Sequence, residues 1–385
     1  MKVFFGSIFA QLILNPYVFW RGWQALPEKK TWRMPYVAFF VVELIVFFTG
    51  FFFHKELPDD LMISILYVCG TWYIYLLYAT LALLIVELLR LSNEIRPWYP
   101  RRVKERWAAV KLSLFFGIIL AVSGLLINGY RNVICPEIRH VHISIPKQAG
   151  DRDSLTIVMM SDLHIGEIIG KEQVRRFVTM SNAQRPDMVV LVGDLVDYEV
   201  RFAEAMHADA DLRLLKAPLG VYAVYGNHEY RANRFAKTRW IRKAGAELLV
   251  DTTLLIDNSF YLIGRDDYIN KSRKPLSLIT KGIDKEKPLI LLDHQPWTLT
   301  EAMMNGIDLG LYGHTHNGQY WPYPLLMKFV YECPYGYYRK GNSQYYVSSG
   351  IGVAGPPYRV GTASEMVVLH VRFGDFPTVL NAGAI

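Results

Sequence analysis

Apolar residues follow two different patterns along the chain. In the first third they form four long runs, at about residues 3–20, 35–53, 61–89 and 112–130. A helix needs about 20 apolar residues to cross a bilayer, and the last three runs are long enough. Gln11 and Asn15-Pro16 interrupt the first run, but no Ala-x-Ala cleavage site follows it, so an uncleaved helix is favoured over a signal peptide. Residues 1–130 are therefore predicted to be a transmembrane region of about four helices.

From about residue 140, short apolar runs alternate with amphipathic stretches. Runs of four to eight residues rich in Val, Ile and Leu predict buried strands, and periodic stretches predict helices. The expected strands are 155–160, 188–192, 220–225, 247–250, 253–256, 259–263, 288–292, 307–312, 344–348 and 365–371, and the expected helices are 172–184, 202–216 and 230–243. This order predicts an α/β domain over residues 151–385, joined to the spans by a connector at 131–150.

Basic residues gather in two of the predicted loops. The connection between the first two runs carries Arg21, Lys29, Lys30 and Arg33, and the connection between the last two carries Arg90, Arg96, Arg101, Arg102, Lys104, Arg106 and Lys111. The positive-inside rule places such loops in the cytoplasm. The sequence thus predicts a multi-pass protein of the cell membrane, with the chain after Tyr130 on the extracytoplasmic side.

The charge of the C-terminal part excludes one class of partner. Residues 1–130 hold 13 Lys and Arg against 8 Asp and Glu, and the remainder holds 29 against 27. The second part is near neutral and lacks the basic stripe that a nucleic-acid-binding surface requires. In the second span, Glu43 favours a helix–helix hydrogen bond over a polar pathway. Cys135 and Cys333 both follow the spans, and a disulfide and two free thiols are equally expected.

Five short motifs bring polar side chains to strand ends in this second part. They are Met160-Ser161-Asp162-Leu163-His164, Gly193-Asp194-Leu195-Val196-Asp197, Gly226-Asn227-His228-Glu229, Asp293-His294 and Gly313-His314-Thr315-His316. Each follows an apolar, strand-like run. Open α/β sheets place their sites at the carboxyl ends of the strands, so we expect these residues to converge.

The residue types in these motifs suit metal binding. Seven of them offer oxygen or nitrogen ligands of intermediate hardness: Asp162, His164, Asp194, Asn227, His294, His314 and His316. Such ligands suit Mn, Fe or Zn rather than calcium. Seven are too many for one transition metal with an open position, but they fit two ions about 3.5–4 Å apart that share a bridging carboxylate. Such a pair polarises phosphoryl oxygens and acidifies a bound water, which supplies hydroxide as the nucleophile.

The ordered motif set resembles that of the calcineurin-like metallophosphoesterase superfamily, over roughly residues 153–371. The N-terminal spans, and Gly350-Ile351-Gly352 after the last histidine motif, are similar to its membrane-linked bacterial phosphodiesterase branch. The resemblance implies a four-layer α/β/β/α sandwich. Two departures stand out: Asn317 replaces a glycine that is common after the last motif, and Ser349 replaces an arginine that often precedes Gly350.

The resemblance also implies a role for each site residue. Asp162, His164 and His316 would hold one ion, Asn227, His294 and His314 would hold the other, and Asp194 would bridge them. The candidate catalytic residues are His228, beside the leaving-group oxygen as acid or charge stabiliser, and Asp197, which would orient His228.

An aromatic, apolar segment follows the last motif and bears on the substrate. It includes Trp321, Tyr323 and Leu325 and is expected either to hold an acyl or isoprenoid chain or to pack on its own domain. The favoured function is hydrolysis of a phosphodiester or pyrophosphate, with a membrane lipid or lipid-linked phosphate as the substrate. Two alternatives are a cytoplasmic-face pyrophosphohydrolase of the UDP-diacylglucosamine type and a catalytically inert membrane receptor or scaffold. Neither the metal pair nor the oligomeric state follows from the sequence.

Overall fold

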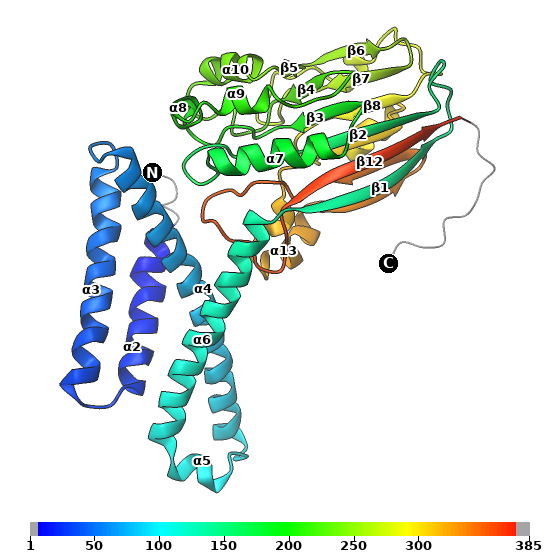
Figure 1. The fold of residues 1–385 in the computed structure, drawn as a ribbon. Helices are drawn as coiled ribbons and strands as arrows, with labels where there is room; N and C mark the ends of the chain where they lie inside the picture. The colour runs from blue at the N-terminus through cyan, green and yellow to red at the C-terminus, as the bar shows by residue number, and fades with distance from the viewer. Residues whose placement is uncertain (1–6, 375–385) are drawn as a thin grey trace. The chain divides into compact units, whose positions relative to one another are not determined.

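The computed structural model describes residues 7–374, and its contacts divide the chain into two compact units. Residues up to Arg131, with the short segment Gly355–Tyr358, form a helical unit. Asn132–Ala354 and the chain from Arg359 onward form an α/β unit. Figure 1 shows the helices of the first unit in blue and cyan and the sheets of the second in green to red.

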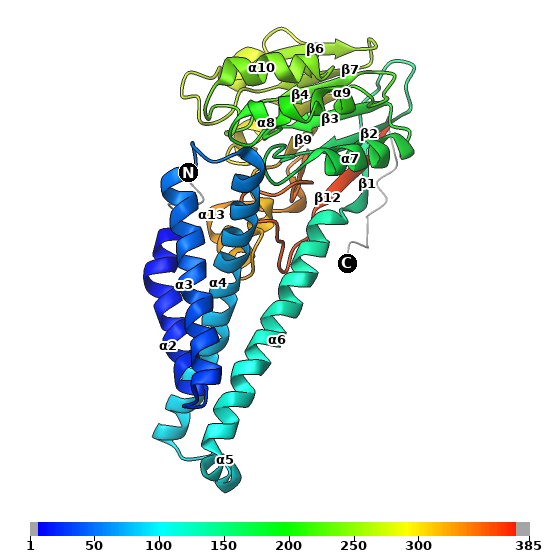
Figure 2. The same cartoon turned by 60° about the vertical axis from the view of Figure 1, so that its left-hand side comes forward.

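The helical unit is built from η1 (Ala10–Leu14), α2 (Asn15–Ala25), α3 (Lys30–Phe53), α4 (Asp59–Ile95), α5 (Arg101–Glu105) and α6 (Trp107–Ile134). Of the described helices, α3, α4 and α6 are long and apolar enough to cross a membrane by length and composition. They contain the last three predicted spans. The first predicted run starts at residue 3, outside the described residues, and its described part is helical. Figure 2 shows α2, α3 and α4 running side by side.

A buried carboxylate joins the first helices of this unit. Glu43 of α3 accepts hydrogen bonds from Gln11 Nε2 at 2.5 Å and from Asn15 Nδ2 at 3.0 Å. Asn15 in turn accepts a hydrogen bond from Trp72 Nε1 of α4 at 3.3 Å. The polar residues that interrupt the first apolar run are therefore the partners of Glu43. The helix–helix interpretation of Glu43 matches these contacts.

The α/β unit contains two six-stranded sheets. The first has the order β1 (Glu137–Ile145), β12 (Glu365–Phe373), β2 (Ser154–Met160), β3 (Met188–Val192), β4 (Val221–Val224), β5 (Glu247–Leu248). The second has the order β10 (Gly336–Lys340), β11 (Ser343–Val347), β9 (Leu309–Tyr312), β8 (Leu289–Leu292), β7 (Phe260–Gly264), β6 (Thr252–Ile256). In the first sheet β2, β3 and β4 are parallel neighbours, and in the second β8, β9 and β11 are.

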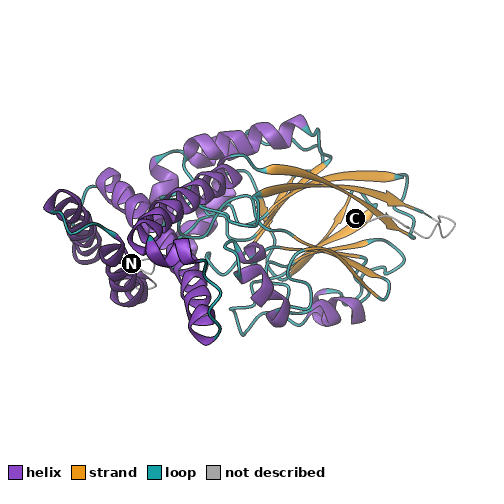
Figure 3. Ribbon diagram, turned by 90° about the horizontal axis from the view of Figure 1, so that it is seen from below, coloured by secondary structure: helices purple, strands orange, loops and turns teal. Residues whose placement is uncertain are grey.

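Helices cover the outer face of each sheet. One side carries α7 (Lys171–Ala183), α8 (Val200–Ala205), α9 (Ala208–Leu212) and α10 (Arg234–Lys243), and the other carries α11 (Leu276–Ile279) and α12 (Leu299–Met304). The facing sides of the sheets share one core, with Ile157 and Met159 from the first and Ile290 and Leu311 from the second. Figure 3 shows the two layers of strands with helices outside them. The predicted four-layer α/β/β/α sandwich is confirmed.

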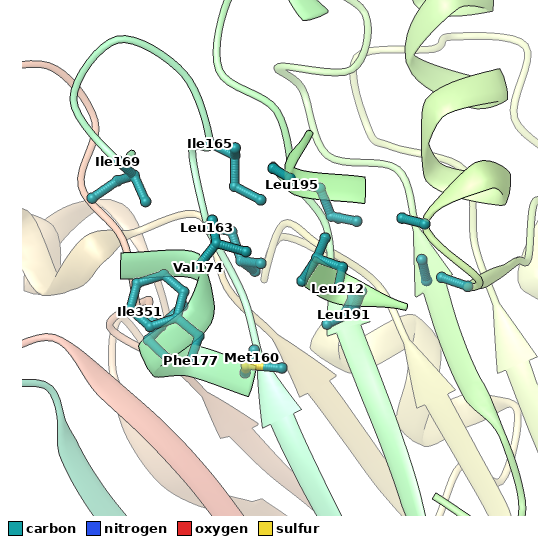
Figure 4. Packing of buried hydrophobic residues seen from close by; sticks show 14 of the residues in the cluster. Met160, Leu163, Ile165, Ile169, Val174, Phe177, Leu191, Leu195, Leu212 and Ile351 are labelled. Atoms are coloured by element: carbon teal, nitrogen blue, oxygen red, sulfur yellow. The ribbon is translucent and has the colours of Figure 1, made fainter. Parts of the chain in front are cut away.

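The packing beneath α7 also supports the loops that carry the site. Phe177 of α7 lies in one apolar cluster with Leu163 and Leu195, which are neighbours of the predicted site residues Asp162 and Asp194 (Figure 4). Full burial of such side chains contributes about 1.5–3 kcal/mol each. The core of the first sheet thus anchors the two loops that leave β2 and β3.

The elements differ from the sequence prediction in a few places. The expected connector 131–150 contains the end of α6 and the strand β1, which pairs in parallel with β12. The expected helix 202–216 is divided into α8 and α9 at His207, which has a left-handed backbone with φ of 54°. The structure adds β10 and α13 (Tyr323–Val330). Cys69, Cys135 and Cys333 are all free thiols.

Candidate active site

The carboxyl ends of the parallel strands in both sheets carry the predicted site residues. Asp162 and His164 follow β2, Asp194 follows β3, and Asn227 and His228 follow β4. In the second sheet, His294 follows β8, and His314 and His316 follow β9. Carboxyl ends of parallel strands lie at one edge of a sheet, and loops at that edge form the site of an open α/β fold. The order of the strands therefore brings residues far apart in sequence to one place.

Five of these residues have an unusual backbone. Asp162, His164, Asp194, His314 and His316 all have positive φ, between 47° and 71°. Residues other than glycine avoid this left-handed region because the Cβ approaches backbone atoms, and such strain of about 1–3 kcal/mol per residue clusters at functional sites. The fold holds these side chains at a cost, which points to a function for their orientation.

The side chains form three overlapping groups with the geometry of metal ligands. The groups are Asp162 with His164 and His316, His164 with Asp194 and His228, and Asp194 with His294 and His314. Each residue of a group offers one ligand atom, and the three ligand atoms of the group all lie within 4.8 Å of one another. Two of the shortest contacts are His164 Nε2 to His316 Nε2 at 3.1 Å and His294 Nε2 to Asp194 Oδ2 at 3.3 Å. Asp194 belongs to two groups and links them.

Buried atoms without hydrogen-bond partners show that the cluster fits cations. The Nδ1 atom of His294 lies 2.8 Å from the carbonyl oxygen of Val192, which can only accept a hydrogen bond. In the neutral imidazole, Nε2 is then unprotonated, and this buried atom has no hydrogen-bond partner although it faces Asp194. The buried Oδ1 atom of Asn227 has no partner either. A cation bound here would be coordinated by these lone pairs and by the neighbouring carboxylates, so each of these atoms would gain a partner.

The electrostatics of the cluster agree with this fit. Burial lowers the pKa of His294, but the negative charges of Asp194, Asp162 and Asp267 and a hydrogen bond to Asp194 together outweigh it and raise that pKa well above its ordinary value. The position therefore attracts positive charge. Burial lowers the pKa of His314 to about 3, so this imidazole is neutral, as a metal ligand must be. Burial raises the pKa of Asp162, because no solvent stabilises its charge.

Asp197 connects two histidines of the cluster. Its Oδ1 atom lies 2.7 Å from His228 Nδ1 and 3.4 Å from His164 Nδ1. Burial opposes ionisation of Asp197, but hydrogen bonds from the two imidazoles lower its pKa below the usual range. A carboxylate on Nδ1 fixes the tautomer and the orientation of an imidazole. The Nε2 atom of His228 lies 4.0 Å from Asp194 Oδ2, so the Nε2 edge of the ring faces the cluster.

Two glycines make room for the cluster. A Cβ on Gly193, where φ is +78°, would lie 2.5 Å from Nδ1 of His294. A Cβ on Gly313 would lie 2.5 Å from Oδ2 of Asp162. Both distances are far below van der Waals contact, so any side chain at these positions would displace a residue of the cluster.

Several residues around the cluster were missed by the sequence prediction. Nη1 of Arg231 contacts Nε2 of His228. The wholly buried Arg359 donates to the carbonyl oxygen of His316 at 3.1 Å and contacts its Nδ1 at 3.2 Å. Arg231 lies two residues after the third motif and is the first cation to follow it, but the order of residues in the sequence shows neither contact.

Two buried charged groups support the loops rather than the cluster itself. The Glu229 carboxylate accepts hydrogen bonds from the backbone N–H groups of Asp194, Leu195, Val196 and Gly226. The Lys237 ammonium donates to the carbonyl oxygens of Val196, Asp197 and His228. Together they tie the loops after β3 and β4 to α10.

The two departures from the family pattern have different consequences. Asn317 has φ of 48°, a left-handed conformation that asparagine tolerates better than most residues, so it preserves the turn of the missing glycine. Ser349 is buried, and its hydroxyl donates to the carbonyl oxygen of Ala363 at 2.8 Å. It provides no cation at that position.

Comparison with known proteins gives the family. A model described as calcineurin-like phosphoesterase matches residues 155–318. An uncharacterized metallophosphoesterase of Campylobacter jejuni is 33% identical over 271 residues, which cover 68% of this chain and 71% of that protein. The chain belongs to the calcineurin-like metallophosphoesterases. The predicted superfamily is confirmed, and with it a metal-dependent phosphoesterase whose family uses two divalent metals.

Relatives of this metallophosphoesterase also match its N-terminal part. An uncharacterized metallophosphoesterase of Helicobacter pylori is 30% identical and covers 90% of this chain and 92% of that protein. A protein of Danio rerio named transmembrane protein with metallophosphoesterase domain is 27% identical and covers 91% of this chain and 83% of that protein. The second name agrees with the three apolar helices of the helical unit.

Proposed function

We propose that this protein is a membrane-anchored dimetal phosphoesterase that hydrolyses a phosphodiester or pyrophosphate bond of a lipid-linked substrate. The observation that carries the proposal is the convergence of buried carboxylate and imidazole groups, whose ligand atoms lie within 4.8 Å of one another in three groups, with Asp194 in two of them. Isolated histidines and aspartates in a hydrolase core would pair with hydrogen-bond donors instead.

The ligands divide into two sets. Asp162, His164 and His316 would hold one ion, and Asn227, His294 and His314 would hold the other, with Asp194 between them. The groups of the structure support this division in part: Asp162, His164 and His316 form one group, His294 and His314 form another with Asp194, and Asp194 also groups with His164. When bound, a pair of divalent ions polarises phosphoryl oxygens and lowers the pKa of water, which makes a nucleophile available at neutral pH.

His228 and Arg231 would act on the other side of the phosphorus atom. His228 faces the cluster through Nε2 and is held through Nδ1 by Asp197 at 2.7 Å, so a proton carried on Nε2 would be directed at the leaving oxygen once a substrate phosphate takes the guanidinium of Arg231 away from that atom. Arg231 contacts the same Nε2 atom and brings a permanent positive charge to the site. A guanidinium there would bind a non-bridging phosphoryl oxygen.

Helix α13 supports a substrate with an apolar chain. Tyr323, Leu325, Leu326, Phe329 and Val330 are all 42–89% exposed, and no residue of this helix is buried. Exposed apolar patches of this kind mark surfaces that contact lipids or other partners.

Both ends of α13 lie at the last histidine motif. A Cβ on Gly318 would lie 2.6 Å from the backbone of Pro324, and the ring of Tyr331 lies 6.3 Å from the ring of His314. The apolar surface therefore begins beside two proposed metal ligands, His314 and His316. A lipid-linked phosphate would place its chain on α13 and its phosphorus at the cluster.

The distribution of basic residues supports an extracytoplasmic catalytic domain. The two basic clusters lie in and next to the connections between α2 and α3 and between α4 and α6, and such clusters favour the cytoplasm. The α/β unit follows the opposite end of α6. A tag placed after Ile385 should be labelled in intact cells by a membrane-impermeant reagent, and protection of that tag would favour a cytoplasmic-face enzyme.

Activity on a substrate panel tests the proposed chemistry. Detergent-purified protein with Mn²⁺ should hydrolyse a lipid-linked diester or pyrophosphate faster than a water-soluble monoester. Asp194→Asn should abolish this activity, because it removes charge from both ligand sets. Activity on no substrate would support an inert scaffold, and full activity in Asp194→Asn would mean that the chemistry occurs elsewhere.

A further inference from the structure

The helical unit contains a large cavity that the phosphoesterase site does not use. It has a volume of about 920 Å³ and is lined by residues of α2, α3, α4 and α6, all within the helical unit. This volume is at the upper end for pockets that bind small molecules. We propose that the cavity binds a glycerophospholipid with an anionic headgroup.

Most of the lining is aromatic or aliphatic. Trp23, Tyr36, Phe40, Trp72 and Phe115 contribute rings, and on α6 the lining continues to Ser123. The rise of a helix places Ser123 about 18 Å from Lys111 along α6. One leaflet of a bilayer has a hydrocarbon layer of about 15 Å, half of the full ~30 Å core. The cavity thus has the depth and the polarity that acyl chains need.

One end of the cavity is cationic. Arg21, Arg33, Arg90 and Lys111 belong to the lining, whereas Glu28 is the one carboxylate among its described residues. These residues lie at or next to the two basic connections. A site with four cations at one end and rings along its length is complementary to an amphiphile with a negative head.

The ion pairs of the lining leave part of this positive charge uncompensated. Arg21 and Arg90 share a single carboxylate, Glu87. Arg90 reaches a second, Glu94, only at 4.0 Å and on the exposed side of the helix.

The other two cations have weaker partners. Arg33 lies 3.5 Å from Glu28, whose side chain is 90% exposed. The buried Nε atom of Arg33 has no hydrogen-bond partner. Lys111 donates to the backbone carbonyl oxygen of Gln24 at 2.8 Å, and none of the described carboxylates forms an ion pair with it. A phosphate group between Arg33 and Lys111 would give both cations the anionic partner that they lack.

The cavity as a whole favours a phospholipid headgroup over a free phosphate ion as the bound anion. A free phosphate ion would leave the apolar lining empty, whereas a phospholipid fills it. Basic residues next to apolar helices attract the anionic lipids of the cytoplasmic leaflet. The inference rests on membrane insertion of the helical unit, which is part of the proposed function, but not on its phosphoesterase chemistry.

Native mass spectrometry of the full chain in detergent tests the proposal. The protein is incubated in EDTA, so that the metal cluster contributes nothing, with equal amounts of phosphatidylglycerol and phosphatidylcholine that carry the same acyl chains. One phosphatidylglycerol per chain should be retained, with a preference of about tenfold over phosphatidylcholine, because the four cations of the lining would repel the positive choline that follows the same phosphate. Equal retention of the two lipids, or displacement of phosphatidylglycerol by millimolar inorganic phosphate, would overturn the proposal.

Matched variants place the lipid in this cavity. Ile118→Trp places a larger side chain in the cavity and should reduce lipid retention at least about fivefold. Leu120 is 72% exposed on the same helix and outside the lining, so Leu120→Trp should leave retention unchanged. Lys111→Gln should remove most of the preference for phosphatidylglycerol, and Lys104→Gln, an exposed lysine outside the lining, should leave it unchanged. Equal behaviour within either pair would contradict the assignment. Protein found in the soluble fraction would instead refute membrane insertion.

Discussion

Replacement of Asp197 by Asn separates the positioning of His228 from the binding of metal. The carboxylate lies 2.7 Å from Nδ1 of His228, and their side chains are only 21% and 9% exposed. Hydrogen bonds from the two imidazoles hold the pKa of Asp197 below its usual range although burial opposes this, so the wild-type group is ionised at neutral pH. Asn keeps the shape of the side chain but removes the charge that fixes His228.

The size of the effect follows from this contact. A hydrogen bond between charged, buried groups contributes about 1.5–3 kcal/mol. If the contact is made in full when the leaving oxygen is protonated, kcat/KM should fall about 10- to 100-fold, since about 1.4 kcal/mol corresponds to a factor of ten. KM should change little, because Asp197 is not expected to touch the substrate.

The assay combines kinetics on a phosphodiester with the metal content of the same sample. Asp197→Asn should retain its metal, because Asp197 lies outside the proposed ligand set. Asp211→Asn is a matched control: this carboxylate is also largely buried and pairs with Arg175 at 3.1 Å, away from the cluster. An unchanged kcat/KM would refute the positioning of His228. Loss of metal in step with activity would show that Asp197 acts through His164, at 3.4 Å.

Three other substitutions test the site and its surroundings. Gly193→Ala should lower metal content and reduce activity at least about tenfold, since its Cβ would lie 2.5 Å from the imidazole of His294. Its control is Gly282→Ala, at a similar φ of +80° but with no atom within 4 Å of the added Cβ, and this variant should keep its metal and its activity. Trp321→Ser combined with Leu325→Ser should lower kcat/KM more for a lipid-linked ester than for a soluble one, and equal losses would exclude a role of the segment 321–330, which includes α13, in chain binding. Lys237→Met removes three buried hydrogen bonds to carbonyl oxygens and should destabilise the fold by about 2–4 kcal/mol, so an unchanged melting temperature would show that these bonds are replaceable.

The sequence was most informative where local patterns determine structure. Apolar runs predicted β2, β3 and β8, and the polar residues directly after them predicted the loops of the site. Parallel pairing then brings those loops together, because strand ends at one edge of a sheet are neighbours. The division of an expected helix into α8 and α9 was not predictable, since nothing in the sequence indicates a left-handed backbone at His207.

Contacts between distant segments limited the prediction of the site. The nine-residue strand β1 pairs with β12, which follows it by more than two hundred residues, and the sequence prediction placed its residues in a connector. Arg359 reaches His316 from a loop outside every motif, and the pattern of apolar residues does not show such a contact. The cavity of the helical unit also depends on how four helices pack, which hydropathy alone does not determine.

The most direct test of the central claim is anomalous diffraction from crystals of the protein grown with Mn²⁺. Two anomalous peaks should appear about 3.5–4 Å apart, both within coordination distance of the Asp194 carboxylate, and one of them should disappear or weaken in His294→Ala. A single peak, or two peaks away from Asp194, would contradict a shared dimetal centre and the chemistry inferred from it.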